Sequence, residues 1–254
     1  MERYFTTDTH FSHPLLTCIR GFYKDTQLGN TATKIYETEG WKATSEWIGN
    51  QPWNGGRMPM AEIADTEAHN KKLVENINSV VKEDDELWIL GDVSYRTPME
   101  DMQHWVKQLN GKKHMIIGNH DGPEGKFRKL LGENSEELLK PYLKVFETVK
   151  LSDELELVDE VSREKFLVAL SHFQYREDQE AEYRQFDEAL KRVDYPNHIL
   201  LHGHTHQNEV FQYENSLHLG LDANKLMPWN EQEIVDLIKF LKFNEMSETV
   251  EKIL

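Results

Sequence analysis

The chain of 254 residues carries 29 lysines and arginines against 45 aspartates and glutamates, which gives a formal net charge of −16 at pH 7. This acidity argues against a long nucleic acid as partner, because duplex-binding surfaces are normally basic. The single cysteine, Cys18, excludes an internal disulfide framework, and the sequence holds no signal-like segment and no apolar run long enough to cross a bilayer, so we expect a cytoplasmic protein with no membrane partner.

The first half of the chain is predicted to alternate strands with helices. Buried aromatic and β-branched runs indicate strands, and apolar residues at helical spacing indicate helices. In chain order, these elements are expected at 3–7, 64–81, 86–90, 98–109 and 113–117. Polar groups follow the three strands, as Asp8-Thr9-His10, Gly91-Asp92 and Gly118-Asn119-His120-Asp121. Since parallel strands in this order end at one edge of the sheet, we expect these groups to gather there.

The segment from Phe22 to Ala64 is predicted to be the least regular part of the chain. Ser12 is expected to cap a short helix before it, with Pro14 in the first turn. The segment itself contains five glycines and three tryptophans and shows no sustained period. We interpret it as an insertion at about 22–64 in a single domain spanning 1–254. It is either a lid whose tryptophans stack a base or an ordered flap whose tryptophans pack on the body.

The second half of the chain is predicted to form another sheet and further helices. Short strands are expected at 145–151, 155–158 and 166–170, in an antiparallel or mixed second sheet. Helices are expected at 126–131, 136–142 and 178–193, and a hairpin is expected to join 209–213 to 217–219. Asn230 and Glu233 form a capping box for a C-terminal helix at about 230–243. The tail from Glu245 could extend that helix, fray or pack on a partner.

An apolar run, Ile199 to Leu201, leads into a second group of polar residues. It is followed by His202-Gly203-His204-Thr205-His206, with imidazoles at alternating positions, and neutral imidazole is the commonest metal ligand. Together with the polar groups after the other strands, the candidate residues are Asp8, His10, Asp92, Asn119, His120, His172, His204 and His206. This set contains no thiolate, exceeds what one ion needs and fits two ions that share a carboxylate.

The order and strand context of these motifs resemble the calcineurin-like metallophosphoesterase superfamily. The residues that carry the likeness are Thr7-Asp8-Thr9-His10, Gly91-Asp92, Gly118-Asn119-His120-Asp121, His172 and Gly203-His204-Thr205-His206. The likeness runs from about Tyr4 to Ala223 and is strongest to the small phosphoesterases of bacteria and their phages. It implies an α/β fold, a four-layer sandwich of two mixed β-sheets flanked by helices, with metals at one edge.

The resemblance also implies a role for each site residue. Asp8, His10 and His206 would hold one metal, Asn119, His172 and His204 would hold the other, and Asp92 would bridge the two and take part in catalysis. His120 would act as general acid or transition-state stabiliser. The expected substrate contacts are Arg96, Asn119 and His120, although Arg96 could equally be an ordinary surface arginine. Asp121 orients His120 or caps a turn, His202 is left as a supporting residue, and His218 lines the pocket or packs in the core.

These residues predict a dinuclear metal-dependent phosphoric ester hydrolase that uses metal-activated hydroxide. The favoured substrate is a phosphodiester of a small nucleotide-like molecule, ahead of a monoester. Two divalent metal ions are expected, with Mn²⁺ first and Fe, Ni or Zn as alternatives, because mixed oxygen and nitrogen ligands accept several metals. The alternatives are a catalytically silent binding scaffold, against which the intact His120 argues, and a nuclease, which would need a basic groove. The sequence fixes neither the physiological substrate nor the oligomeric state.

Overall fold

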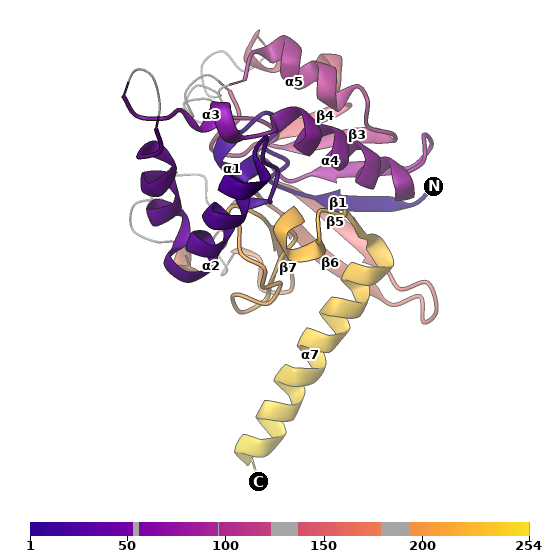
Figure 1. Ribbon diagram of the computed structural model, residues 1–254. Helices are drawn as coiled ribbons and strands as arrows, with labels where there is room; N and C mark the ends of the chain where they lie inside the picture. The colour runs from indigo at the N-terminus through magenta and orange to yellow at the C-terminus, as the bar shows by residue number, and fades with distance from the viewer. Residues whose placement is uncertain (53–55, 96, 123–136, 179–190, 192–193, 254) are drawn as a thin grey trace.

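The computed structural model describes residues 1–52, 56–95, 97–122, 137–178, 191 and 194–253, and within them two sheets lie face to face (Figure 1). The first sheet has the order β4-β3-β2-β1-β9, and the second has the order β5-β6-β7-β8. The first is parallel except for β9, which runs antiparallel to β1, and the second is parallel except for the β5–β6 pair. The strands are β1 (Arg3–Thr6), β2 (Glu86–Ile89), β3 (Lys112–Ile116), β4 (Thr148–Lys150), β5 (Asp153–Val158), β6 (Lys165–Leu170), β7 (Ile199–His202), β8 (Ser216–His218) and β9 (Trp229–Asn230).

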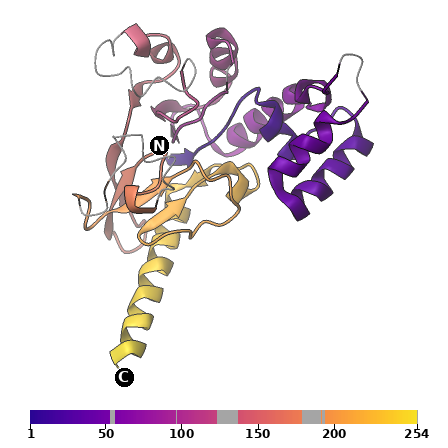
Figure 2. The same ribbon diagram turned by 90° about the vertical axis from the view of Figure 1, so that its left-hand side faces the viewer.

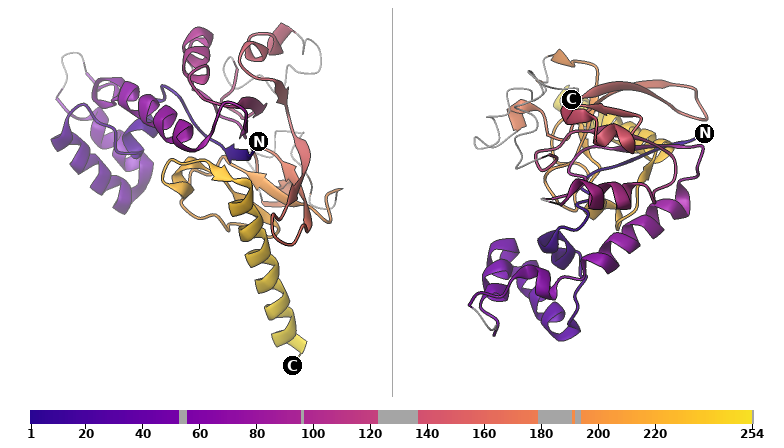
Figure 3. Two further views of the ribbon diagram at one scale, coloured as in Figure 1. Left: turned by 90° about the vertical axis from the view of Figure 1, so that its right-hand side faces the viewer. Right: turned by 90° about the horizontal axis from the view of Figure 1, so that it is seen from above.

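Helices flank the two sheets. The α-helices are α1 (Pro14–Ile19), α2 (Thr26–Gly49), α3 (Met60–Ile63), α4 (Thr66–Val80), α5 (Met99–Val106) and α7 (Glu231–Ile253), with short 3₁₀ turns at 142–144, 176–178 and 221–224. The first three gather to one side of the sheets, and α7 extends away from the body (Figures 2 and 3). Two mixed sheets flanked by helices confirm the predicted α/β sandwich. Within the described residues, no helix combines the length and the apolar character that spanning a bilayer requires.

The core follows from the alternation of side chains along the strands of the first sheet. Leu87 and Ile89 of β2 point to one face, where they pack with Leu73 of α4 and its neighbours. Trp88 points to the other face, which packs on Phe166 and its neighbours in the second sheet. Successive residues of a strand face opposite sides, so a sheet covered on both faces reads as a continuous apolar run. Each large side chain buried in this way contributes roughly 1.5–3 kcal/mol.

The prediction of an irregular segment from 22 to 64 is wrong, because most of it is helical. The 24-residue α2 is interrupted only at Gly40, where φ is +79° and the axis kinks. Gly29 lies inside this helix because its backbone packs against Tyr23, where a Cβ would come within 2.5 Å of the ring. Of the glycines that suggested loops, Gly29 therefore marks close packing and Gly40 a kink. Whether the segment acts as a lid stays a prediction.

Other differences concern strand pairing and helix ends. The strand expected at 145–151 is β4, which joins the first sheet beside β3 and not the second. The predicted hairpin is wrong, since 209–213 forms no strand and β8 pairs in parallel with β7. The strand β9 was not predicted. The capping box of α7 is present, with the backbone N–H of Asn230 donating to Glu233 at 2.8 Å, and the helix continues through the tail.

Two of the predicted helices fall wholly or mostly outside the described residues, and the cap of a third helix differs from the prediction. The helix expected at 126–131 and most of the one expected at 178–193 lie outside the described residues, as does Arg96. The cap of α1 differs from the prediction. His13 accepts the N–H of Leu16 through Nδ1, while Ser12 is held by the side chain of Asn70.

Candidate metal centre

The predicted site residues lie on loops that leave the carboxyl ends of five strands. Asp8 and His10 follow β1, Asp92 follows β2, Asn119 and His120 follow β3, His172 follows β6, and His204 and His206 follow β7. Five of these residues have a positive φ: Asp8 (58°), His10 (45°), Asp92 (51°), His204 (74°) and His206 (53°). Such left-handed conformations cost about 1–2 kcal/mol per residue and gather at functional sites, where the surroundings impose them.

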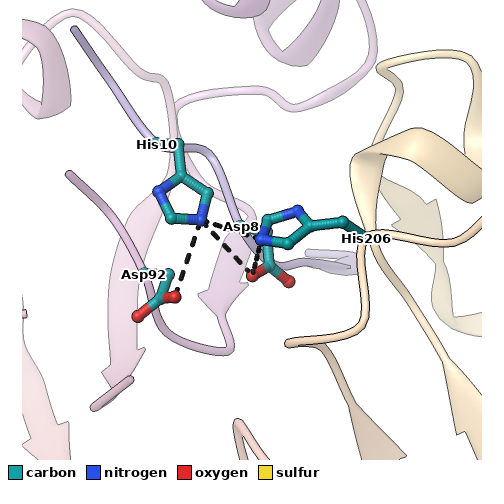
Figure 4. A group of neighbouring side chains, drawn as sticks. All are labelled: Asp8, His10, Asp92 and His206. Atoms are coloured by element: carbon teal, nitrogen blue, oxygen red, sulfur yellow. Dashed lines mark hydrogen bonds and ion pairs between the residues drawn. The ribbon is translucent and has the colours of Figure 1, made fainter. Parts of the chain in front are cut away.

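The first cluster joins Asp8, His10, Asp92 and His206, which point toward one another (Figure 4). One ligand atom of each lies within 4.8 Å of the other three. The Nε2 atoms of His10 and His206 are 3.2 Å apart. They lie 3.7 and 3.6 Å from the same oxygen of Asp8, Oδ1. Two imidazole nitrogens and two carboxylates with this spacing fit the ligands of one divalent cation.

The second cluster shares Asp92 with the first and adds His172 and His204. The Oδ2 atom of Asp92 lies 3.3 Å from His172 Nε2 and 3.5 Å from His10 Nε2, so it faces both clusters. Asn119 extends the second cluster, since its Oδ1 atom lies 3.0 Å from His172 Nε2. The structure therefore brings all seven predicted metal ligands together, with Asp92 between two groups. Their role as ligands stays a prediction.

The two buried carboxylates show that this centre fits cations. Asp8 Oδ2 accepts hydrogen bonds from Thr7 Oγ1 at 2.8 Å and from the backbone N–H of His204 at 3.0 Å. Asp92 Oδ1 accepts the backbone N–H of His120 at 2.8 Å. The other oxygen of each, Asp8 Oδ1 and Asp92 Oδ2, is buried and has no hydrogen-bond partner among the described residues. A buried carboxylate oxygen without a donor is costly, and a cation between the clusters would remove that cost.

The ring of His172 gives the same indication. Its Nδ1 lies 2.9 Å from the carbonyl oxygen of Leu90, which fixes the proton there and turns Nε2 toward Asp92 and Asn119. In the neutral ring, His172 Nε2, Asp92 Oδ2 and Asn119 Oδ1 would be three acceptor atoms facing one another. Burial alone would lower the pKa of His172, but the carboxylates of Asp92 and Asp8 raise it to about 9. The pocket therefore favours a positive charge at this point.

The loop after β3 places His120 at the rim of the clusters. Its ring lies 5.6 Å from that of His10 and 4.8 Å from that of Tyr95, which also contacts His13 at 4.1 Å. Burial lowers the pKa of His120 although the charge of Asp92 raises it, so the ring is neutral at pH 7. Asp121 is a cap, since its carboxylate accepts the backbone N–H groups of Asp92, Val93 and Gly118.

Sequence reasoning missed two residues beside the first cluster, Arg20 and Asp222, whose side chains are only 2% and 10% exposed. Asp222 Oδ2 lies 3.5 Å from His206 Nδ1 and 2.9 Å from an Arg20 guanidinium nitrogen. Burial favours the neutral acid, but Arg20 and His206 hold the pKa of Asp222 well below its usual range. The one signal for Asp222 was its place in the stretch 219–223, where the resemblance ends. His202 and His218 are buried behind the centre, with ring centroids 5.6 Å apart, and belong to neither cluster.

A family model described as the calcineurin-like phosphoesterase superfamily domain matches residues 58–221. The chain belongs to the calcineurin-like phosphoesterase superfamily. The matched range holds Asp92, Asn119, His172, His204 and His206. Asp8 and His10 precede it, and the geometry of the first cluster joins them to the rest. For a calcineurin-like phosphoesterase, the two Asp/His clusters indicate binding of divalent metal.

Relatives of this calcineurin-like phosphoesterase occur in phages. The Gene 66 protein of Mycobacterium phage L5 is 31% identical over 197 residues, which cover 74% of this chain and 90% of that protein. The Gene 66 protein of Mycobacterium phage D29 is 32% identical over 184 residues, covering 67% and 85%. The crystal structure of a protein of unknown function from Aquifex aeolicus aligns with a TM-score of 0.51 at 19% identity, covering 93% of this chain and 98% of that one. This last likeness concerns the fold alone.

Proposed function

We propose that this chain hydrolyses the phosphodiester bond of a small nucleotide-like molecule, with two divalent cations held in the two clusters and Mn²⁺ the first choice. The observation that carries the proposal is the position of Asp92, whose unpartnered Oδ2 faces His10 on one side and His172 on the other. When bound there, a pair of divalent cations would lower the pKa of a water molecule and neutralise charge on the phosphoryl oxygens.

The residues of the chain would bind and orient the substrate. The neutral His120 ring lies beside the clusters and can donate one N–H to the leaving oxygen, where negative charge develops. Asn119 would offer its amide oxygen to the second cation and its amide N–H to the phosphate. Asp121 holds the backbone of both the Asp92 loop and the Gly118 loop, so it keeps His120 and Asp92 in fixed relation.

The proposed partner is a small phosphorylated substrate in the cytoplasm. The net charge of −16 would repel a long polyanion, which disfavours a nuclease acting on duplexes. Phosphodiesters carry one negative charge and approach an acidic surface more readily than dianionic monoesters. This difference supports a diesterase ahead of a monoesterase.

The test is hydrolysis of bis-p-nitrophenyl phosphate and of p-nitrophenyl phosphate by protein reconstituted with Mn²⁺. We expect turnover of the diester to exceed that of the monoester, and we expect Asp92→Asn to abolish both. His120→Gln should lower kcat by about 10²–10⁴-fold, the usual contribution of acid–base or oxyanion groups. His104→Gln, an exposed histidine on α5, is the matched control and should keep full activity.

Absence of turnover with every divalent metal would contradict the proposal, and so would full activity in Asp92→Asn. Cleavage of a long oligonucleotide at a rate above that of the small diester would favour the nuclease. Tight binding of the diester without turnover would favour a silent scaffold.

A further inference from the structure

The loop from Asp8 to Ser12 is the most strained part of the centre. Three of its residues, Asp8, His10 and Ser12, have positive φ values of 58°, 45° and 63°. A non-glycine residue adopts this conformation only where its surroundings hold it, and alternate residues doing so in one loop require contacts from outside the loop. The loop carries two of the predicted metal ligands, so whatever holds it also sets the geometry of the first cluster.

Arg20 supplies those contacts from the end of α1. Its side chain is 2% exposed, and the structure gives an acceptor to each of its five N–H groups. Two nitrogens bind the two oxygens of Asp222, at 2.8 and 2.9 Å. The backbone carbonyls of Asp8 and Thr9 accept at 2.8 and 3.2 Å, and His69 Nε2 lies at 3.2 Å. The planar guanidinium presents its five donors in a fixed arrangement that matches these acceptors, and a lysine ammonium could not reproduce it.

Two of the acceptors of Arg20, Asp222 and His69, contact further residues of the centre. Asp222 Oδ2 lies 3.5 Å from His206 Nδ1 without a hydrogen bond to it, and the negative charge there favours the proton on Nδ1, which leaves Nε2 as the ligand atom. On the other side, His69 Nδ1 lies 3.2 Å from Asn70 Oδ1, and that side chain holds Ser12 through its N–H and its hydroxyl. The loop is thus fixed at both of its ends by one buried network.

We infer that Arg20 is the positioning residue of the first metal cluster, holding the strained Asp8–His10 loop directly and the ring of His206 through Asp222. The inference rests on the proposed two-metal site. Arg20 touches neither a ligand nitrogen nor a ligand oxygen that faces the cluster, so its effect is on the geometry of this cluster and not on the chemistry of the substrate. The five N–H groups of Arg20 are all used on Asp8, Thr9, His69 and Asp222, so we expect its loss to weaken the first cluster more than the second, around His172.

The test is Mn²⁺ binding by calorimetry, with electron paramagnetic resonance of the bound ions, on the full chain. Wild type should bind two equivalents that are spin-coupled. Arg20→Met, Arg20→Lys and Asp222→Asn should each weaken one equivalent by about 10–100-fold, the usual effect of groups that orient metal ligands. The remaining equivalent should give the six-line signal of an isolated ion. Lysine keeps the charge, so a wild-type result for Arg20→Lys would overturn the role of the fork.

Arg3→Met is the matched control. Arg3 also makes a forked pair with a carboxylate, Glu231, through contacts of 2.6 Å, but at the far end of β1 from the centre. This variant should keep both equivalents. Equal weakening of both equivalents in Arg20→Met, or two unchanged ones, would overturn the inference. If circular dichroism shows that Arg20→Met does not fold, Mn²⁺ binding by Asp222→Asn decides the test. Failure of wild type to bind Mn²⁺ would overturn both this inference and the proposed function, whereas coupled binding without hydrolysis would leave only the function refuted.

Discussion

Stability at acidic pH should depend on His69, a fully buried histidine that faces Arg20 and Asp222. Burial, with the charge of Arg20, lowers the pKa of His69 to about 3 from an ordinary value of 6.5. Between these values the unfolded chain binds a proton at this position and the folded chain does not. The contribution to stability is therefore fully present above pH 6.5 and falls as the pH decreases. Each pH unit is worth about 1.4 kcal/mol, so lowering the pH from about 7 to about 5 should cost about 2 kcal/mol at this residue.

The assay is urea unfolding of the metal-free protein at both pH values, with wild type and His69→Gln compared. Glutamine can accept the Arg20 N–H through Oε1 but takes up no proton. The loss of stability between the two pH values should be about 2 kcal/mol smaller in this variant than in wild type. His104→Gln, at an exposed site, should show the full wild-type loss. An identical loss in His69→Gln and wild type would refute the reasoning.

Three further predictions test the centre and the core. In Gly118→Ala, the new Cβ would lie 2.1 Å from Asp92 Oδ1 and 2.4 Å from its backbone nitrogen, so calorimetry should show at least about tenfold weaker Mn²⁺ binding. The control Gly40→Ala strains only the kink of α2, where φ is +79° and the new Cβ meets no atom within 4 Å, so it should bind Mn²⁺ normally. Ile238→Ala in the inter-sheet core should lower the urea unfolding free energy by about 2–5 kcal/mol, against less than about 0.5 for Phe243→Ala, which is 70% exposed. Mn²⁺ at about 100-fold its Kd should stabilise wild type by about 2.7 kcal/mol per site, and chelation should remove this gain in a thermal melt.

The convergence of the site residues could be predicted because the information is local. A buried strand followed by Gly-Asp or Gly-Asn-His places a polar side chain at a sheet edge, and parallel strands bring those edges together. His204 and His206 follow the same logic after β7. The α/β class could be predicted from the same alternation of strands and helices, whereas the two-sheet sandwich came from the family resemblance.

What could not be predicted depends on pairing across long distances in the chain. Arg20 and Asp222 are 202 residues apart, and neither lies in a pattern that indicates its partner. The residues of the short β4 would suit a strand of either sheet, and only its pairing with β3 places it in the first sheet. The helix α2 was missed because Gly29 and Gly40 read as turn residues, whereas Gly29 packs against Tyr23 and Gly40 only kinks the helix.

The central claim is that loops from five strands hold two neighbouring cations with Asp92 between them. An anomalous difference map from a crystal soaked in Mn²⁺ tests it most directly. The account predicts two peaks about 3.5–4 Å apart, one beside Asp8, His10 and His206 and the other beside Asn119, His172 and His204. A single peak in a closed tetrahedral site, or two peaks without Asp92 between them, would contradict it.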